Sequence, residues 1–172
     1  MKANIVFEDS RWQILPLKKI ALASLNLVAD NVFLNSKDLE ISILASNDCE
    51  LMDLNKQFRG HNVPTNILSW PEHDYKRTKP GELPKRISKS SDCINGSYFL
   101  GNLAISFDRC STEAENRNIT VEDHIAHLLI HGCLHLVGFD HDNKLDAILM
   151  ENIEKKLLSD LGIKNPYELI DQ

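Results

Sequence analysis

The sequence lacks any long apolar run. No stretch of about 18 consecutive uncharged apolar residues occurs among its 172 residues, so we expect no membrane-spanning helix. The segment 1–9 contains too short an apolar stretch for a secretory signal peptide. With 42% hydrophobic and 26% charged residues, the composition is that of an ordinary globular protein, which at this length is expected to fold as one domain, 1–172.

Closely spaced cysteine pairs are lacking as well. The four cysteines are widely scattered and form no C-x-x-C pair; they are Cys49, Cys93, Cys110 and Cys133. Scattered thiols are typical of a reduced protein rather than of a secreted disulfide framework. The sequence therefore predicts a cytoplasmic protein with unpaired cysteines.

An overall excess of positive charge is also lacking, because the formal net charge is −6, which argues weakly against nucleic acid binding. The charge is unevenly distributed, however. Segment 76–89 carries six basic residues against Glu82 alone, a net charge of +5. Such a patch can bind a phosphate backbone even on an acidic protein, and it is equally consistent with a solvated loop. The basic residues are Lys76, Arg77, Lys79, Lys85, Arg86 and Lys89.

Hydrophobic periodicity divides the chain into strands and helices that do not alternate strictly. This mixture predicts an α+β fold, in which a small mixed β-sheet of about four strands packs with about five helices. Segment 72–96, rich in Pro, Ser and Lys, is expected to be irregular. The expected strands are 3–8, 39–45, 66–70 and 98–107. The expected helices are 17–33, 48–58 with Asp48 as N-cap, 108–116, a histidine-rich helix opened by Thr120, and 143–161.

The most informative segment is 131–141, with the sequence His-Gly-Cys-Leu-His-Leu-Val-Gly-Phe-Asp-His. His131 and His135 stand one turn apart on one helix face, so two ring nitrogens can reach one point. Gly138 permits the positive-φ turn that ends a helix, after which His141 can return from the other side. Three neutral imidazoles can hold a metal ion and leave one position open, as catalytic zinc sites do. The central helix is therefore predicted to carry a metal site.

Other interpretations of this helix stay open. His124 and His127 share its histidine-bearing face, and His127 and His131 form a rival i,i+4 pair. We prefer the first set because Gly138 explains the return of the third ligand, and we expect the other two histidines to support the ligands or the fold. Cys133 lies about 200° around the helix from His131 and is expected to be buried, away from the metal.

The histidine spacing matches the H-E-x-x-H-x-x-G-x-x-H motif of metalloproteases, with one difference. Gly132 occupies the position of the glutamate that these proteases use as general base. The metal ligands survive this replacement, whereas the proton acceptor is lost. The interpretation as a metallopeptidase is therefore weakened, although the metal site remains.

A second unusual segment, 54–71, places Arg59-Gly60 at an expected helix end, before a turn and a strand. An arginine there can grip a phosphate with two N–H groups. It can also serve as a helix-end cation that satisfies the last-turn carbonyls. From Arg59 alone, both interpretations stay open.

Together, these segments resemble the YbeY family of bacterial metal-dependent endoribonucleases. Segment 131–141 matches the whole family signature H-G-x-L-H-L-x-G-[YF]-D-H. Segment 54–71 is similar to the family's L-N-x-x-[FY]-R-G…P-T-[DN]-x-L-S-[FW]-P motif, and segment 100–106 is similar to its L-G-D-I-x-I-S strand. The resemblance spans nearly the whole chain.

The resemblance implies one zinc ion per chain, bound by His131, His135 and His141, and a catalytic site that these residues form with Arg59. It implies cleavage of single-stranded RNA in the cytoplasm. The implied role is maturation of the 3′ end of small-subunit (16S) ribosomal RNA and ribosome quality control, with small-subunit proteins as candidate partners. The alternative outside enzymology is a ribosome assembly factor whose zinc is structural.

Two positions depart from the family pattern. Asn66 and Asn102 stand where members commonly carry Asp. If either carboxylate assists water or orients a ligand, this chain is expected to be slower or to use a different base. The sequence identifies no general base, although Asp140 could orient a histidine through its second ring nitrogen.

Overall fold

The computed structural model of the chain describes residues 1–32, 39–75, 79–84 and 97–168. Within these ranges the strands form one four-stranded mixed sheet in the order β1-β2-β4-β3. β1 (Lys2–Phe7), β2 (Leu39–Ser46) and β4 (Tyr98–Ser106) run parallel, and β3 (Ile67–Pro71) pairs antiparallel with β4 at one edge. The predicted α+β fold, with four strands and five helices in the described residues, is confirmed.

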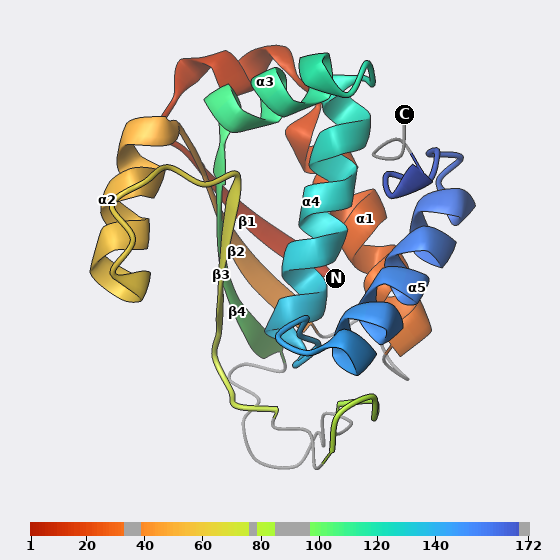
Figure 1. Ribbon diagram of the computed structural model, residues 1–172. Helices are drawn as coiled ribbons and strands as arrows, with labels where there is room; N and C mark the ends of the chain where they lie inside the picture. The colour runs from red at the N-terminus through yellow and green to blue at the C-terminus, as the bar shows by residue number, and fades with distance from the viewer. Residues whose placement is uncertain (33–38, 76–78, 85–96, 169–172) are drawn as a thin grey trace.

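The helices cover the two faces of the sheet unequally (Figure 1). α1 (Leu17–Val32) and α4 (Val121–Leu136) lie on one face, and α5 (Lys144–Asp160) lies beyond them, packed on α4. α2 (Asp48–Arg59) covers the other face, and α3 (Phe107–Asn116) follows β4 at the end of the sheet. Because α4 contacts α1, α3, α5 and the sheet, the histidine-rich helix is central, as predicted.

The core follows the alternation of the strands. Side chains of β2 point in turn to the two faces of the sheet, as a period of two residues requires. Those that meet α1 and α4 in the larger core are Leu39, Ile41, Ile43 and Ala45. A smaller core under α2 consists of Leu51, Leu68 and Ala104.

α4 is buried on several sides, because ten of its sixteen residues are buried. Thr120 caps its N-terminus and accepts a hydrogen bond from the N–H of Asp123, as predicted. At Gly132 the helix lies directly on the sheet. A Cβ atom added there would stand 2.8 Å from Cδ1 of Ile67 and 3.0 Å from Cδ2 of Leu103. The glycine therefore faces the sheet and allows α4 to approach it closely.

The cap of α2 differs from the prediction by one residue. Asn47, not Asp48, is the N-cap, and its side chain accepts hydrogen bonds from the N–H groups of Cys49 and Glu50. Asp48 stands at the first helical position. Its carboxylate instead accepts a bond from the Ser106 hydroxyl at 2.6 Å, which joins α2 to the end of β4.

One element had no periodic signal in the sequence. A short 3-10 helix, η1 (Ser10–Ile14), follows β1 and carries the fully buried Trp12. The Trp12 indole N–H donates to the carbonyl of Ser46 at 2.8 Å, so the loop is fixed by one aromatic anchor. A five-residue helix is too short for helical periodicity to reveal it.

The predictions about the cysteines, the irregular segment and membrane helices can be compared with the structure only within the described residues. Cys49, Cys110 and Cys133 are unpaired as predicted, and Cys133 is buried, which raises the pKa of its thiol to about 12. Cys93 and residues 76–78 and 85–96 of the segment expected to be irregular lie outside the described residues. None of the helices in the described part of the chain combines the length and hydropathy needed to cross a membrane.

Gly101 gives a test of the sheet geometry. It has φ 139° beside a register shift between β2 and β4, and a Cβ there would lie 2.1 Å from the carbonyl oxygen of Trp70. We predict that Gly101→Ala lowers the free energy of unfolding by about 3 kcal/mol or more, through strain and overpacking. Chemical denaturation measures this.

The matched control is Gly162→Ala. Gly162 also has a positive φ, 74°, but an added Cβ meets nothing within 4 Å. That substitution should lower the free energy of unfolding by about 1 kcal/mol, because alanine is strained in the left-handed backbone conformation. Equal losses in the two variants would contradict the close approach of β3 and β4.

Candidate metal centre

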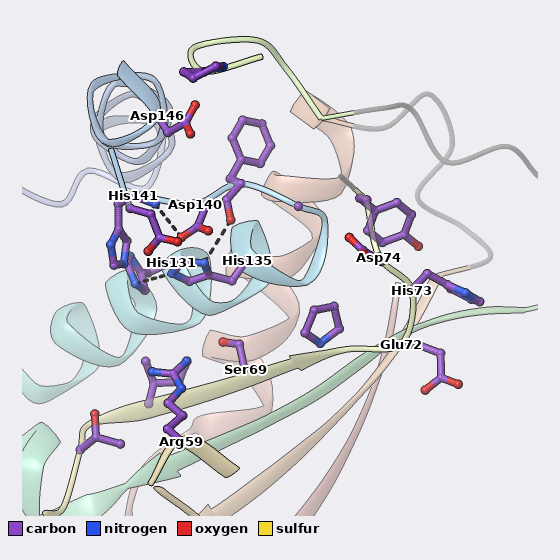
Figure 2. Close-up of a pocket in the computed structure, with 18 of the residues that line it drawn as sticks. Arg59, Ser69, Glu72, His73, Asp74, His131, His135, Asp140, His141 and Asp146 are labelled. Atoms are coloured by element: carbon purple, nitrogen blue, oxygen red, sulfur yellow. Dashed lines mark hydrogen bonds between the residues drawn. The ribbon is translucent and has the colours of Figure 1, made fainter. Parts of the chain in front are cut away.

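Three histidines come together where α4 ends (Figure 2). Ligand atoms of His131, His135 and His141 all lie within 4.8 Å of one another. The Nε2 atoms of His131 and His135 are 3.1 Å apart. Two nitrogens bound to a tetrahedral zinc ion lie about 3.3 Å apart, so these atoms are already close to the spacing that a metal needs.

The turn after α4 brings the third histidine back. Gly138 has φ 91°, the positive value predicted from the sequence, and its N–H bonds to the carbonyl of His135. A Cβ at this position would lie 2.6 Å from Cβ of Tyr75, so the glycine also lets the turn touch the segment after β3. The chain then reverses, and the ring of His141 lies 4.9 Å from that of His135, measured between centroids.

Hydrogen bonds at the far side of two rings fix which nitrogen can bind a metal. Nδ1 of His131 lies 2.8 Å from Oε1 of Glu154, and Nδ1 of His135 lies 3.1 Å from the carbonyl oxygen of Phe139. A carboxylate and a carbonyl only accept, so both Nδ1 atoms carry the proton and both Nε2 atoms present lone pairs. Two lone pairs 3.1 Å apart repel unless a cation lies between them. The donor set therefore fits a metal ion.

The other two histidines of α4 have the opposite arrangement. His124 and His127 use Nε2 to bond to Glu113 and Glu154, at 2.8 and 3.1 Å, and their buried Nδ1 atoms have no partner among the described residues. His127 and His131 thus point different nitrogens at the same carboxylate rather than converging on one point. The rival pair, His127 and His131, is therefore not brought together as ligands. His124 and His127 instead take part in buried hydrogen bonds.

Glu154 is a residue of the site that the sequence analysis missed. It is 0% exposed and accepts bonds from His127, His131 and the hydroxyl of Tyr167. Burial alone would raise its pKa, but the bonds from the two histidines hold the pKa of this carboxyl well below its usual range. A signal was present in the sequence: Glu154 falls at helical spacing among Met150, Leu157 and Leu158, on the apolar face of α5.

His135 is kept neutral by its surroundings. Burial, followed by the neighbouring His131 and His141, lowers its pKa from 6.5 to about 4. At neutral pH its Nε2 lone pair therefore does not compete with a proton. A neutral imidazole is the form that binds metal.

A wide cleft of about 1250 Å³ opens beside the histidines. Arg59 lines it from the end of α2, and Figure 2 shows its side chain extending toward the histidine cluster. The last-turn carbonyls of Asn55 and Lys56 already accept bonds from the backbone N–H groups of Gly60 and His61. Arg59 is thus not needed to cap this helix, and its exposed side chain makes no hydrogen bond or ion pair with the residues that the structure describes.

The two departures from the family pattern have different surroundings. Asn66 lines the cleft, and its Nδ2 donates to Oε2 of Glu113 at 3.0 Å. A carboxylate at position 66 would instead face the Glu113 carboxylate, so the amide suits this neighbour. Asn102 is exposed in β4 and does not line the cleft. Asp140 accepts a bond from the backbone N–H of His141, at 2.8 Å.

Little of the basic segment 76–89 can be placed relative to this cleft. Lys79 lines it. The other five basic residues, Lys76, Arg77, Lys85, Arg86 and Lys89, lie outside the described residues.

Known proteins resemble this chain along nearly its whole length. A family model described as "Endoribonuclease YbeY" matches residues 4–162. Proteins of the same description are similar along almost their whole length: one from Jannaschia sp. is 37% identical, covering 97% of this chain and 100% of its own. One from Ruegeria pomeroyi is 38% identical, covering 98% and 99%. A solution structure of a Thermotoga maritima protein matches with a TM-score of 0.53 at 19% identity, over 99% of this chain and 96% of its own, which supports the fold alone.

The lowered pKa of His135 gives a test on the metal-free protein. Unfolded, His135 takes up a proton near pH 6.5, but folded only near pH 4. Between these values the unfolded state binds more protons. The stabilisation linked to neutral His135 is therefore fully present above pH 6.5 and is lost as the pH falls toward 4. From pH 7 to 5, wild type should lose about 2 kcal/mol more than His135→Asn. Urea titrations at both pH values measure this, and equal losses in the two proteins would contradict it.

Proposed function

This chain belongs to the YbeY family of endoribonucleases, and on that premise we propose that it is a zinc-dependent endoribonuclease that cleaves single-stranded RNA. One observation carries the proposal: the ring nitrogens of His131, His135 and His141 converge at the wall of a wide cleft that also holds Arg59. Three protein ligands leave one coordination position open, which distinguishes a catalytic from a structural zinc site. The chain 1–172 acts as one domain and binds one ion.

In this proposal the histidines bind the metal and Arg59 binds the phosphate. When bound, zinc supplies a Lewis acid and lowers the pKa of water from 15.7 toward about 7. His131 and His135, through Nε2, and His141 would hold the ion, and they would leave its full charge uncompensated because neutral imidazoles add none. Arg59 grips a non-bridging oxygen of the scissile phosphate and stabilises the charge that develops there.

Two alternatives are weaker on specific grounds. A metallopeptidase needs a base at the position of Gly132, but this glycine faces Ile67 and Leu103 of the sheet, where a glutamate side chain has no room. A ribosome assembly factor with structural zinc needs a closed set of four ligands. Within the described residues the histidine group has three members, not four. The other candidate group consists of Asp140, His141 and Asp142; it shares His141 with the first group and is largely exposed.

The finer assignment concerns the RNA. We propose that the substrate is the 3′ end of small-subunit (16S) ribosomal RNA, that the enzyme serves ribosome quality control in the cytoplasm, and that small-subunit proteins are its partners. The family resemblance of segments 54–71, 100–106 and 131–141 supports this assignment. Cleavage of a precursor with its 3′ extension, compared with a scrambled RNA of equal length, tests it: preference for the precursor is expected, and equal rates would contradict it.

Two substitutions should separate metal binding from phosphate binding. His135→Ala should lose both zinc and RNA cleavage. Arg59→Ala should keep zinc but lower kcat/KM on single-stranded RNA about 100-fold, as removal of a charge-stabilising donor does. Metal content by mass spectrometry and a fluorescent RNA assay measure the two effects.

The matched control is Lys56→Ala. Lys56 is an exposed cation one turn earlier on α2 that does not line the cleft, so the same charge is lost without the same contact. It should cleave RNA at close to the wild-type rate. Undiminished cleavage by zinc-free His135→Ala, or cleavage of casein instead of RNA, would contradict the proposed function.

The ends of the products identify the nucleophile. Attack by water leaves no cyclic phosphate, whereas attack by the neighbouring RNA 2′-hydroxyl leaves a 2′,3′-cyclic phosphate. A zinc ion held by three protein ligands would make water a nucleophile near neutral pH, so we predict that cyclic ends are absent. End-group analysis by mass spectrometry measures this, and cyclic products would exclude direct attack by water.

A further inference from the structure

We propose that Glu154, anchored by Tyr167, is the positioning residue of the metal centre: its buried carboxylate holds the ring of His131 in the orientation and tautomer that bind the ion. The proposal rests on the proposed function, since it takes His131 as a metal ligand. It adds a helix and a C-terminal segment to a site that the 131–141 motif leaves incomplete.

The position of Glu154 is unusual for a carboxylate. It lies on α5, fully buried, in the same core that holds Met150 and Leu157. A carboxylate in such a place is costly unless each oxygen is hydrogen-bonded. Both oxygens are: Oε1 accepts from His131 at 2.8 Å, and Oε2 accepts from His127 at 3.1 Å and from the Tyr167 hydroxyl at 2.5 Å.

The bond to His131 is the one with a consequence for the metal. Without it the imidazole can rotate about its bond to Cβ, or move its proton to Nε2, and either change removes the ligand lone pair. A carboxylate on the far ring nitrogen prevents both. Among the described residues, the other two ligand histidines have no such distant partner. His135 bonds to the carbonyl of Phe139, four residues later, and His141 lies in an exposed segment six residues after His135.

Tyr167 carries the restraint to the C-terminal segment. Its backbone N–H bonds to the side chain of Asn165, and its ring lies 5.0 Å from the Lys155 ammonium. Its hydroxyl can donate only if the segment after α5 folds back over that helix. The segment thereby limits the motion of Glu154, so loss of the Tyr167 hydroxyl should weaken metal binding without touching a ligand.

The test measures zinc affinity by competition with a chelator, together with the visible spectrum of the cobalt-substituted protein. Glu154→Leu removes both acceptors and should weaken zinc binding about 100-fold. Glu154→Gln keeps one acceptor and should weaken it about 10-fold, and Tyr167→Phe should weaken it several-fold. Losses of 10–100-fold are typical when the hydrogen-bonded partner of a metal-binding histidine is removed.

The matched control is Glu151→Gln. Glu151 lies one turn earlier on α5, but its carboxylate faces Lys155 rather than the histidines. This variant should bind zinc within about twofold of wild type and keep the wild-type cobalt spectrum. Thermal unfolding of each metal-free variant confirms that it is folded; if Glu154→Leu does not fold, Glu154→Gln and Tyr167→Phe decide the question.

The outcomes separate the two proposals. If wild type binds no zinc, or if His135→Ala binds zinc with the same affinity as wild type, the metal centre of the proposed function fails and this inference fails with it. If wild type binds zinc and the folded Glu154 variants bind it equally well, with an unchanged cobalt spectrum, only the positioning role fails. An equal loss in Glu151→Gln would also overturn it, because charge alone would then explain the effect.

Discussion

The structure depends on one constraint: four imidazoles stand on one face of α4, a helix in which ten of sixteen residues are buried. An imidazole has two ring nitrogens, and in the interior each needs a partner or carries a cost. Two carboxylates on neighbouring helices meet part of this need: Glu113 from α3 bonds one ring nitrogen of His124, and Glu154 from α5 bonds one each of His127 and His131. The packing of α3 and α5 around α4 is therefore linked to the polar row that α4 carries.

The row of histidines has two halves with different chemistry. In the inner half, His124 and His127 direct Nε2 to a carboxylate and keep Nδ1 buried. In the outer half, the proton lies on Nδ1, and Nε2 is left to face a third histidine and the cleft. Depth along α4 thus separates histidines that stabilise the fold from histidines that can bind a metal.

Much of this could be predicted from the sequence. Helical spacing and Gly138 were sufficient to bring His131, His135 and His141 together, because one turn of helix and one positive-φ residue are local properties. The α+β fold followed from periodicity in the same way. Trp12 had no such signal, since η1 is too short for a period and its anchor, the carbonyl of Ser46, is distant in the chain.

Glu154 and Glu113 were missed for a different reason. Each lies on another helix than the histidine it contacts, and only the three-dimensional packing of α3, α4 and α5 brings them near. A glutamate on the apolar face of a helix is a signal of a buried partner, but the sequence does not say which residue that partner is. The role of Gly132 likewise needed the sheet: its sequence position suggested a missing base, and the structure adds a close contact with Ile67 and Leu103.

The most direct test of the metal centre is anomalous X-ray diffraction from crystals of the zinc-loaded protein. The account predicts one strong peak about 2.1 Å from Nε2 of both His131 and His135, also bound by His141, with the fourth position open to the cleft. A peak between His127 and Glu154, or a fourth protein ligand that closes the site, would contradict it.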